Sequence, residues 1–91
     1  MIIISQDKLQ IFNFETAKNI WIEEEEVEIN QIEQTAYSIY IDGEISGAYL
    51  TEERAKEVLQ EIIKTYLDCN EQNVLAEFAY VKNKVFEMPK E

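Results

Sequence analysis

The segment Ala36–Leu67 reads AYSIYIDGEISGAYLTEERAKEVLQEIIKTYL and joins a hairpin pattern to a helical pattern. In its first part, two runs rich in β-branched and aromatic residues flank the dipeptide Asp42-Gly43. A two-residue Asp-Gly loop is typical of a type I′ turn, because both of its residues need a positive φ. We therefore predict a β-hairpin with strands Ala36–Ile41 and Glu44–Leu50.

The two-residue turn also predicts the register of this hairpin. It places Tyr40 opposite Ile45 and Ile39 opposite Ser46. A cross-strand pair of an aromatic and a β-branched side chain stabilises a sheet, so the pairing of Tyr40 with Ile45 favours this register.

The second part of the segment has the spacing of an amphipathic helix. Apolar residues recur at intervals of three and four: Ala55, Val58, Leu59, Ile62, Ile63, Tyr66 and Leu67. Thr51 is the expected N-cap. We predict a helix from Thr51 to about Asp68 that ends at Asn70, because asparagine tolerates the left-handed conformation. The side chains expected to lie on the sheet are Val58, Leu59, Ile62, Ile63 and Tyr66.

The rest of the chain supplies further strands on both sides of this segment. The strands expected before it are Met1–Ser5, Lys8–Phe14 and Asn19–Glu25, with Val27–Ile32 as a fourth strand or a continuation of the third. After the helix, Val74–Val81 fits a helix or a strand, of which helix is favoured. A short final strand is predicted at Lys84–Met88, since Pro89 favours an extended predecessor. The sequence thus predicts an α+β fold, in which an antiparallel sheet of about four to five strands packs against one long helix.

Length and composition set limits on function. The chain has 91 residues, which predicts one domain over residues 1–91, with a strand-rich half (1–50) and a half that holds the helix and the C-terminal segment (51–91). A hydrophobic fraction of 46% argues against a disordered chain. The net charge of −11 argues against direct binding to nucleic acid or to an anionic membrane, because both need Lys and Arg.

The residue types that carry most catalysis are scarce. There is no His, and the single Cys69 leaves no internal disulfide and no cysteine-based zinc site. Two glycines are too few for a phosphate-binding loop, and no nucleophile has a base beside it. We predict a protein that is not an enzyme and binds no cofactor. Because the sequence has no signal-peptide pattern and no long apolar run, we expect a cytoplasmic protein.

One acidic run is conspicuous. Glu23, Glu24, Glu25 and Glu26 are consecutive and Glu28 follows, so residues 1–50 carry a net charge of −8 and residues 51–91 a net charge of −3. Three interpretations compete. The run is a solvated strand that protects a sheet edge from aggregation, a site for Ca²⁺ or Mg²⁺, or an acidic surface for a basic partner.

The third interpretation has a geometric basis. A strand rises about 3.3 Å per residue, and one DNA strand carries one charge per ~3.4 Å of axis. A Glu run in a strand therefore has nearly the charge density of a nucleic-acid strand, although only alternate carboxylates share a face. The candidate partner-binding residues are Glu23, Glu24, Glu25, Glu26, Glu28 and Trp21. For Trp21 an aromatic anchor is one interpretation, and a core position between Ile20 and Ile22 is the favoured one.

Three stretches also resemble a known group of proteins. They are Ile3–Phe14 (IISQDKLQIFNF), Thr51–Tyr66 (TEERAKEVLQEIIKTY) and Phe86–Glu91 (FEMPKE), and they cover a little over a third of the chain. They resemble a group of small uncharacterised proteins of low-GC Gram-positive bacteria and their phages. The resemblance implies a mobile-element setting, in which small acidic inhibitors of host nucleases, including anti-CRISPR proteins, are common. No functional residue is carried over, because the group has no assigned activity.

The combined hypothesis is a non-enzymatic binding protein. In its specific form, the protein is a phage-type inhibitor that places an acidic surface on a basic, nucleic-acid-binding protein and so mimics a nucleic acid. The alternative is a structural or assembly module that forms homo-oligomers, such as a homodimer, through an exposed strand.

Overall fold

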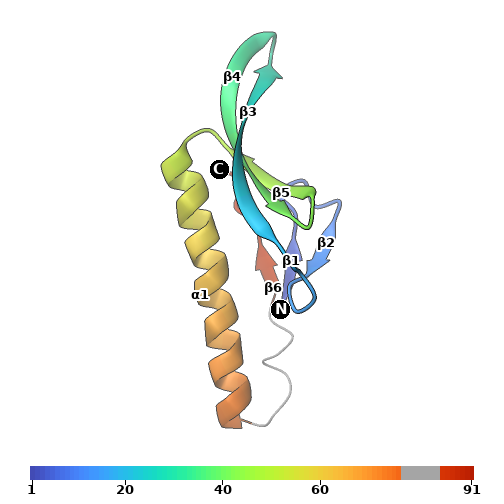
Figure 1. The fold of residues 1–91 in the computed structure, drawn as a ribbon, viewed down its shortest axis with the longest axis vertical. Coiled ribbons are helices and arrows are strands. Elements are labelled where there is room, and N and C mark those ends of the chain that lie inside the picture. The colour runs from blue at the N-terminus through green and yellow to red at the C-terminus, as the bar shows by residue number, and fades with distance from the viewer. Residues whose placement is uncertain (77–84) are drawn as a thin grey trace.

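Over the residues that it describes, a computed structural model shows six strands and one long helix (Figure 1). It describes residues 1–76 and 85–91. The elements are β1 (Ile2–Ile4), β2 (Ile11–Asn13), β3 (Ile20–Ile29), β4 (Ile32–Ile41), β5 (Glu44–Tyr49), α1 (Glu52–Ala76) and β6 (Val85–Glu87). The predicted α+β fold, with antiparallel strands, one long helix and a short C-terminal strand, is confirmed.

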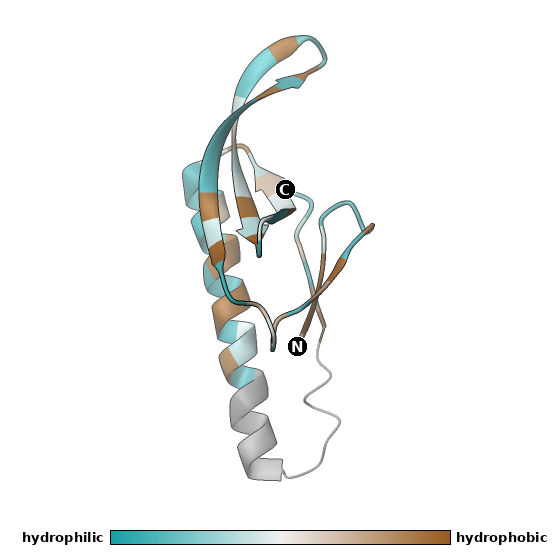
Figure 2. Ribbon diagram, turned by 45° about the vertical axis from the view of Figure 1, so that its right-hand side comes forward, coloured by the Kyte–Doolittle hydropathy of each residue, from teal (hydrophilic) through white to brown (hydrophobic). Residues whose placement is uncertain are grey.

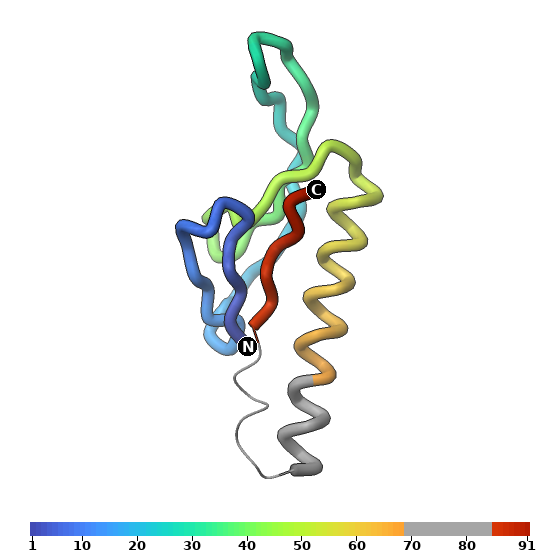
Figure 3. The backbone as a smooth tube through the Cα atoms, turned by 180° about the vertical axis from the view of Figure 1, so that it is seen from behind, coloured from blue at the N-terminus to red at the C-terminus, as the bar shows by residue number. Residues whose placement is uncertain are grey.

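The strands form two sheets of three strands each. One sheet has the order β3-β4-β5 and is antiparallel throughout. The other has the order β2-β1-β6, in which β1 and β2 are antiparallel and β1 and β6 are parallel. Figure 3 shows the N-terminal and C-terminal strands side by side. Parallel strands cannot be joined by a hairpin and need a long connection. Here the chain between β1 and β6, which includes α1, brings β6 beside β1 in the same direction.

The hydrophobic core lies between α1 and the two sheets. Its buried side chains are Met1, Ile3, Ile39, Ile41, Tyr49, Ala55, Val58, Ile62 and Met88. Tyr66 of α1 meets Phe14 edge-on, with ring centroids 5.0 Å apart, so the helix contacts the segments of both sheets. The predicted stripe was too wide at Ile63, which is 40% exposed.

The start of α1 is confirmed and its predicted end is wrong. The Thr51 hydroxyl oxygen accepts the Arg54 N–H at 3.1 Å, as expected of an N-cap. The helix continues past Asn70 to Ala76, because no glycine or proline interrupts this part of the chain. Of the helix predicted from residue 74, residues 77–81 lie outside the described residues. Over the described residues, no helix is long and apolar enough to cross a membrane.

The strands β3 and β4 form one long hairpin of ten residues each. Asn30 and Gln31 join them with φ values of 53° and 67°, which is a turn with both central residues in the left-handed region. The acidic run therefore belongs to one continuous strand, and Ile32 begins β4 instead of ending β3. Asparagine tolerates this conformation better than most residues, and this fits its place in the turn.

The Asp42-Gly43 turn is confirmed, with φ values of 49° and 90°. Tyr40 faces Ile45 as predicted, but Ile39 faces Gly47 and not Ser46. A β-bulge at Ser46 causes this shift, and the Ser46 hydroxyl donates a hydrogen bond to the Ile39 carbonyl at 2.9 Å. The two-residue turn sets the pairing near the loop, but an extra residue farther along changes it.

The outer edge of β5 is closed by Gln6, which follows β1. The Gln6 N–H donates to the Ser46 carbonyl at 2.7 Å. The Gln6 side-chain amide accepts the Ala48 N–H at 2.9 Å and donates to the Ala48 carbonyl at 3.1 Å. This amide takes the place of a neighbouring strand at the β5 edge and links the two sheets.

Candidate functional site

The β3–β4 hairpin extends beyond the rest of the fold, past the N-terminal end of α1 (Figure 1). We call residues Ile20–Ile41 the acidic hairpin. It carries six carboxylates and no Lys or Arg: Glu23, Glu24, Glu25, Glu26, Glu28 and Glu33. Figure 2 shows that its protruding part is largely hydrophilic, with apolar positions near the tip. Ile29 and Ile32, next to the turn, are 41% and 61% exposed.

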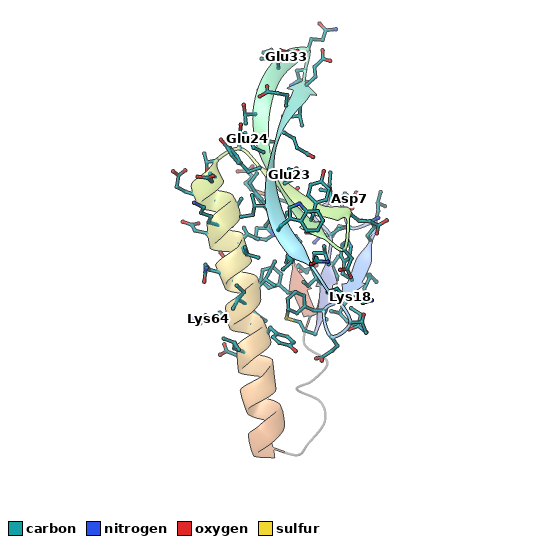
Figure 4. All side chains as sticks on the ribbon, in the orientation of Figure 1. Asp7, Lys18, Glu23, Glu24, Glu33 and Lys64 are labelled. Atoms are coloured by element: carbon teal, nitrogen blue, oxygen red, sulfur yellow. The ribbon has the colours of Figure 1, made fainter. Side chains whose placement is uncertain are left out.

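One face of the acidic hairpin gathers most of its negative charge. Because side chains alternate along a strand, Glu24, Glu26 and Glu28 share a face, and each is exposed. Glu33 on β4 lies directly opposite Glu28 and extends this face onto the second strand. Figure 4 shows Glu33 near the tip and Glu24 lower on the hairpin. Four carboxylates from two strands therefore point to the same side.

This acidic face continues into the first turn of α1 through Tyr37. Tyr37 lies opposite Glu24 in the β3–β4 register. Burial raises the pKa of Tyr37, and the negative charges of Glu24 and Glu52 raise it further. Glu53 acts in the same direction. Carboxylates of the hairpin and of the first turn of the helix thus act on the same phenol.

The opposite face of the hairpin carries fewer carboxylates, and one of them, Glu25, accepts two hydrogen bonds. The Ser38 hydroxyl donates a hydrogen bond to Glu25 at 2.9 Å, and the Tyr40 hydroxyl donates one to the other oxygen of the same carboxylate. The hydrogen bond to Glu25, followed by burial, raises the pKa of Tyr40 to about 12. Trp21 stacks on Tyr40, with ring centroids 5.2 Å apart and planes 6° apart.

The favoured interpretation of Trp21 as a core residue is wrong. Its side chain is 37% exposed and lies outside the buried cluster. Ile20 and Ile22 point to the inner face of β3 and pack against the core, so the residue between them points outward. The partly exposed Trp21 ring lies on the same face as Glu23, which is also exposed.

Among the described residues, the charge of the acidic hairpin has no counterion. Within residues 1–76 and 85–91, none of its six carboxylates forms an ion pair. Carboxylates elsewhere do: those of Glu15, Glu52, Glu57, Glu61 and Glu87. The basic groups that form ion pairs therefore compensate charge on the body of the fold and leave the hairpin negative.

The structure places every predicted site residue on the acidic hairpin but divides them between its faces. Glu24, Glu26 and Glu28 lie on one face, and Glu23, Glu25 and Trp21 on the other. Sequence reasoning missed Glu33 because it did not place a turn at Asn30-Gln31. With that turn, the pairing of Glu33 with Glu28 follows directly.

Two negative findings bear on this site. Among the described residues, no group of three or more His, Cys, Asp or Glu is arranged to hold a metal ion. No family model, curated protein or solved structure matches the chain.

Proposed function

We propose that this protein is a non-enzymatic binding protein of the cytoplasm that places the acidic hairpin on a basic surface of another protein. The observation that carries the proposal is a protruding hairpin with six carboxylates, none of which forms an ion pair in the described chain. Uncompensated like charges destabilise a folded protein, so a basic partner would relieve a cost that the free protein bears.

The geometry of the hairpin supports a partner that binds nucleic acid. Such proteins line a groove with Lys and Arg at the spacing of phosphates. The acidic hairpin is narrow, has only two strands at its tip and projects from the fold, so it can enter a groove that a flat surface cannot (Figure 1). Complementary charge would speed association and make binding sensitive to salt. In this form the protein is an inhibitor that mimics a nucleic acid, as anti-CRISPR proteins do.

A second function, self-assembly through β3, is favoured by one observation. Within the described chain, β3 pairs only with β4, so its outer edge is open. However, antiparallel pairing of two β3 strands near their centres sets Glu23–Glu26 of one copy against glutamates of the other. Like charges directly opposite each other destabilise a sheet. Self-assembly is therefore the weaker proposal at neutral pH.

The test is affinity capture from a lysate of a low-GC Gram-positive bacterium, followed by reconstitution with the captured protein after purification. Three baits are compared: the wild type, E24Q/E26Q/E28Q, and the control E57Q/E61Q on the helix. We expect a basic protein that the wild type and the control retain, and that the triple variant binds at least tenfold more weakly at low salt. Duplex DNA should compete with the wild type for the purified partner.

Three results would contradict the proposal. Equal binding by the triple variant would leave the carboxylates with the sole role of protecting an open sheet edge. Equal losses from both variants would mean that total charge matters and the hairpin does not. A concentration-dependent homodimer that forms without a partner and weakens above neutral pH would favour self-assembly, which sedimentation velocity measures.

A further inference from the structure

We propose that the open edge of β3 accepts an extended basic segment of the partner as an added strand. This inference rests on the proposed function and specifies how the partner binds. Strand addition uses main-chain hydrogen bonds for affinity and side chains for specificity. The two edge strands of the sheet β3-β4-β5 differ as strand addition requires, because the edge of β5 is occupied and the edge of β3 is open.

One edge of this sheet is occupied by another part of the chain, and the other edge has no neighbour among the described residues. At β5, Gln6 occupies the edge through its main-chain N–H and through both ends of its side-chain amide. At β3, the described chain supplies no neighbour beyond β4. The open edge is ten residues long, which is longer than a typical strand. Natural proteins usually cover or disrupt long open edges, because such edges can pair with another chain.

The hairpin geometry identifies the main-chain groups that face outward. A two-residue turn makes its flanking residues, Ile29 and Ile32, a hydrogen-bonded pair, and such pairs then alternate along the ladder. Odd-numbered residues of β3 therefore bond to β4, and even-numbered ones direct N–H and C=O to the open edge. The hydrogen bond from the Asp42 N–H to the Asn19 carbonyl, at 2.9 Å, agrees with this alternation. The outward-facing residues are Ile20, Ile22, Glu24, Glu26 and Glu28.

The negative charge of β3 determines which kind of segment can pair with its open edge. In an added strand, each residue lies opposite one residue of β3, and both side chains point to the same face. The consecutive residues Glu23–Glu26 alternate between the two faces, which halves the charge available to a flat partner. Consecutive Lys or Arg residues in an added strand alternate in the same way, so each one meets a glutamate. A basic segment in strand conformation thus matches the whole run.

The first experiment uses a synthetic ten-residue peptide with four consecutive lysines between valines and threonines. Its control has the same side chains but every main-chain nitrogen methylated, so that the charge is kept and the main-chain donors of both strand edges are lost. We expect the first peptide to bind at least tenfold more tightly. On binding, the amides of Glu24, Glu26 and Glu28 should exchange with deuterium at least tenfold more slowly, as NMR measures.

The second experiment changes the protein edge. Glu26→Pro removes an outward N–H without breaking a main-chain hydrogen bond to β4, although it loses the side-chain hydrogen bond that Glu26 accepts from the Thr35 hydroxyl at 3.1 Å. Proline is tolerated at such edge positions. Glu26→Gln is the matched control, because it loses the same charge and keeps the N–H. We expect E26P to bind the lysine peptide at least tenfold more weakly than E26Q does. The comparison of the two peptides on the wild type gives the same information where E26P fails to fold.

Equal binding of the two peptides, unchanged exchange of the three outward amides, or absence of binding by either peptide would overturn strand addition. The proposed function has a separate test, because it fails on the results of the capture experiment given above, such as a triple glutamine variant that binds the captured partner as well as the wild type does.

Discussion

Removal of charge from the acidic hairpin should make the free protein more stable. In E24Q/E26Q/E28Q, three exposed carboxylates on one face become amides of almost the same size and shape. The described structure shows no ion pair that these substitutions would break. Only the mutual repulsion of the carboxylates is relieved, together with the repulsion between Glu28 and Glu33 across the hairpin.

The size of the effect follows from the strand geometry. Alternate residues lie about 6.6 Å apart, where two unit charges in water repel by ~0.6 kcal/mol before screening. A Debye length of about 8 Å at 0.15 M salt reduces this to ~0.3 kcal/mol for each of two pairs. Glu28 and Glu33, about 5 Å apart, add ~0.4 kcal/mol after screening. The unfolded chain retains part of the repulsion, so we expect a gain of ~0.5–1 kcal/mol.

Urea unfolding followed by circular dichroism measures this gain. For a domain of this size, ~0.5–1 kcal/mol raises the urea midpoint by roughly 0.3–1 M with an unchanged slope. At 1 M salt the Debye length falls to about 3 Å and the gain should nearly vanish. The control E57Q/E61Q loses two contacts with Arg54, of 2.9 and 3.2 Å, and should shift the midpoint in the opposite direction. A triple variant less stable than the wild type, or a gain that persists at 1 M salt, would refute this reasoning.

Three further predictions concern the fold and its ionisable groups. Ile62→Ala, at a fully buried position of α1, should lower the free energy of unfolding by roughly 2–5 kcal/mol in urea titrations, whereas a change below ~1 kcal/mol would mean that the helix does not pack as described. The N–H groups of Asn19 and Lys18 lower the pKa of Asp42, so its contribution to stability is present above about pH 4 and is lost as the pH falls through the lower folded value. The Tm difference between wild type and Asp42→Asn should therefore shrink in melts at pH 3 and below, and a constant difference would contradict this. Tyr40→Phe should remove one phenol that titrates near pH 12 from the curve of ultraviolet absorbance against pH. The stability that the raised pKa of Tyr40 contributes should be fully present below about pH 10 and be lost as the pH rises through about 12.

Features with a local physical cause could be predicted from the sequence. The spacing of Val58 and Ile62 predicted the helix and its buried face, and Asp42-Gly43 predicted a turn with positive φ values. Both depend on residues close together in the chain. The concentration of charge before residue 50 also predicted the region that carries the candidate site, because charge is a property of composition.

Features that depend on distant residues could not be predicted. The bulge at Ser46 changes the register only within the folded sheet, where Gly47 fits closely against Tyr49 and Met88. A β-carbon at Gly47 would lie 3.0 Å from the Tyr49 hydroxyl and 3.1 Å from the Met88 Cε. The exposure of Trp21 depends on which face of β3 the helix covers. The open edge of β3 follows from strand order, which no local pattern contains.

The parallel pairing of β1 with β6 has a consequence for the order in which the protein folds during synthesis. β1 is made first, but Ile3 pairs with Phe86, and buried Met88 completes the core. Native contacts between residues so far apart form slowly, because a long chain must first close into a loop. We expect the nascent chain to remain without its full core until residue 88 has left the ribosome. During that interval the net charge of −8 in residues 1–50 would keep the exposed apolar strands of neighbouring nascent chains apart.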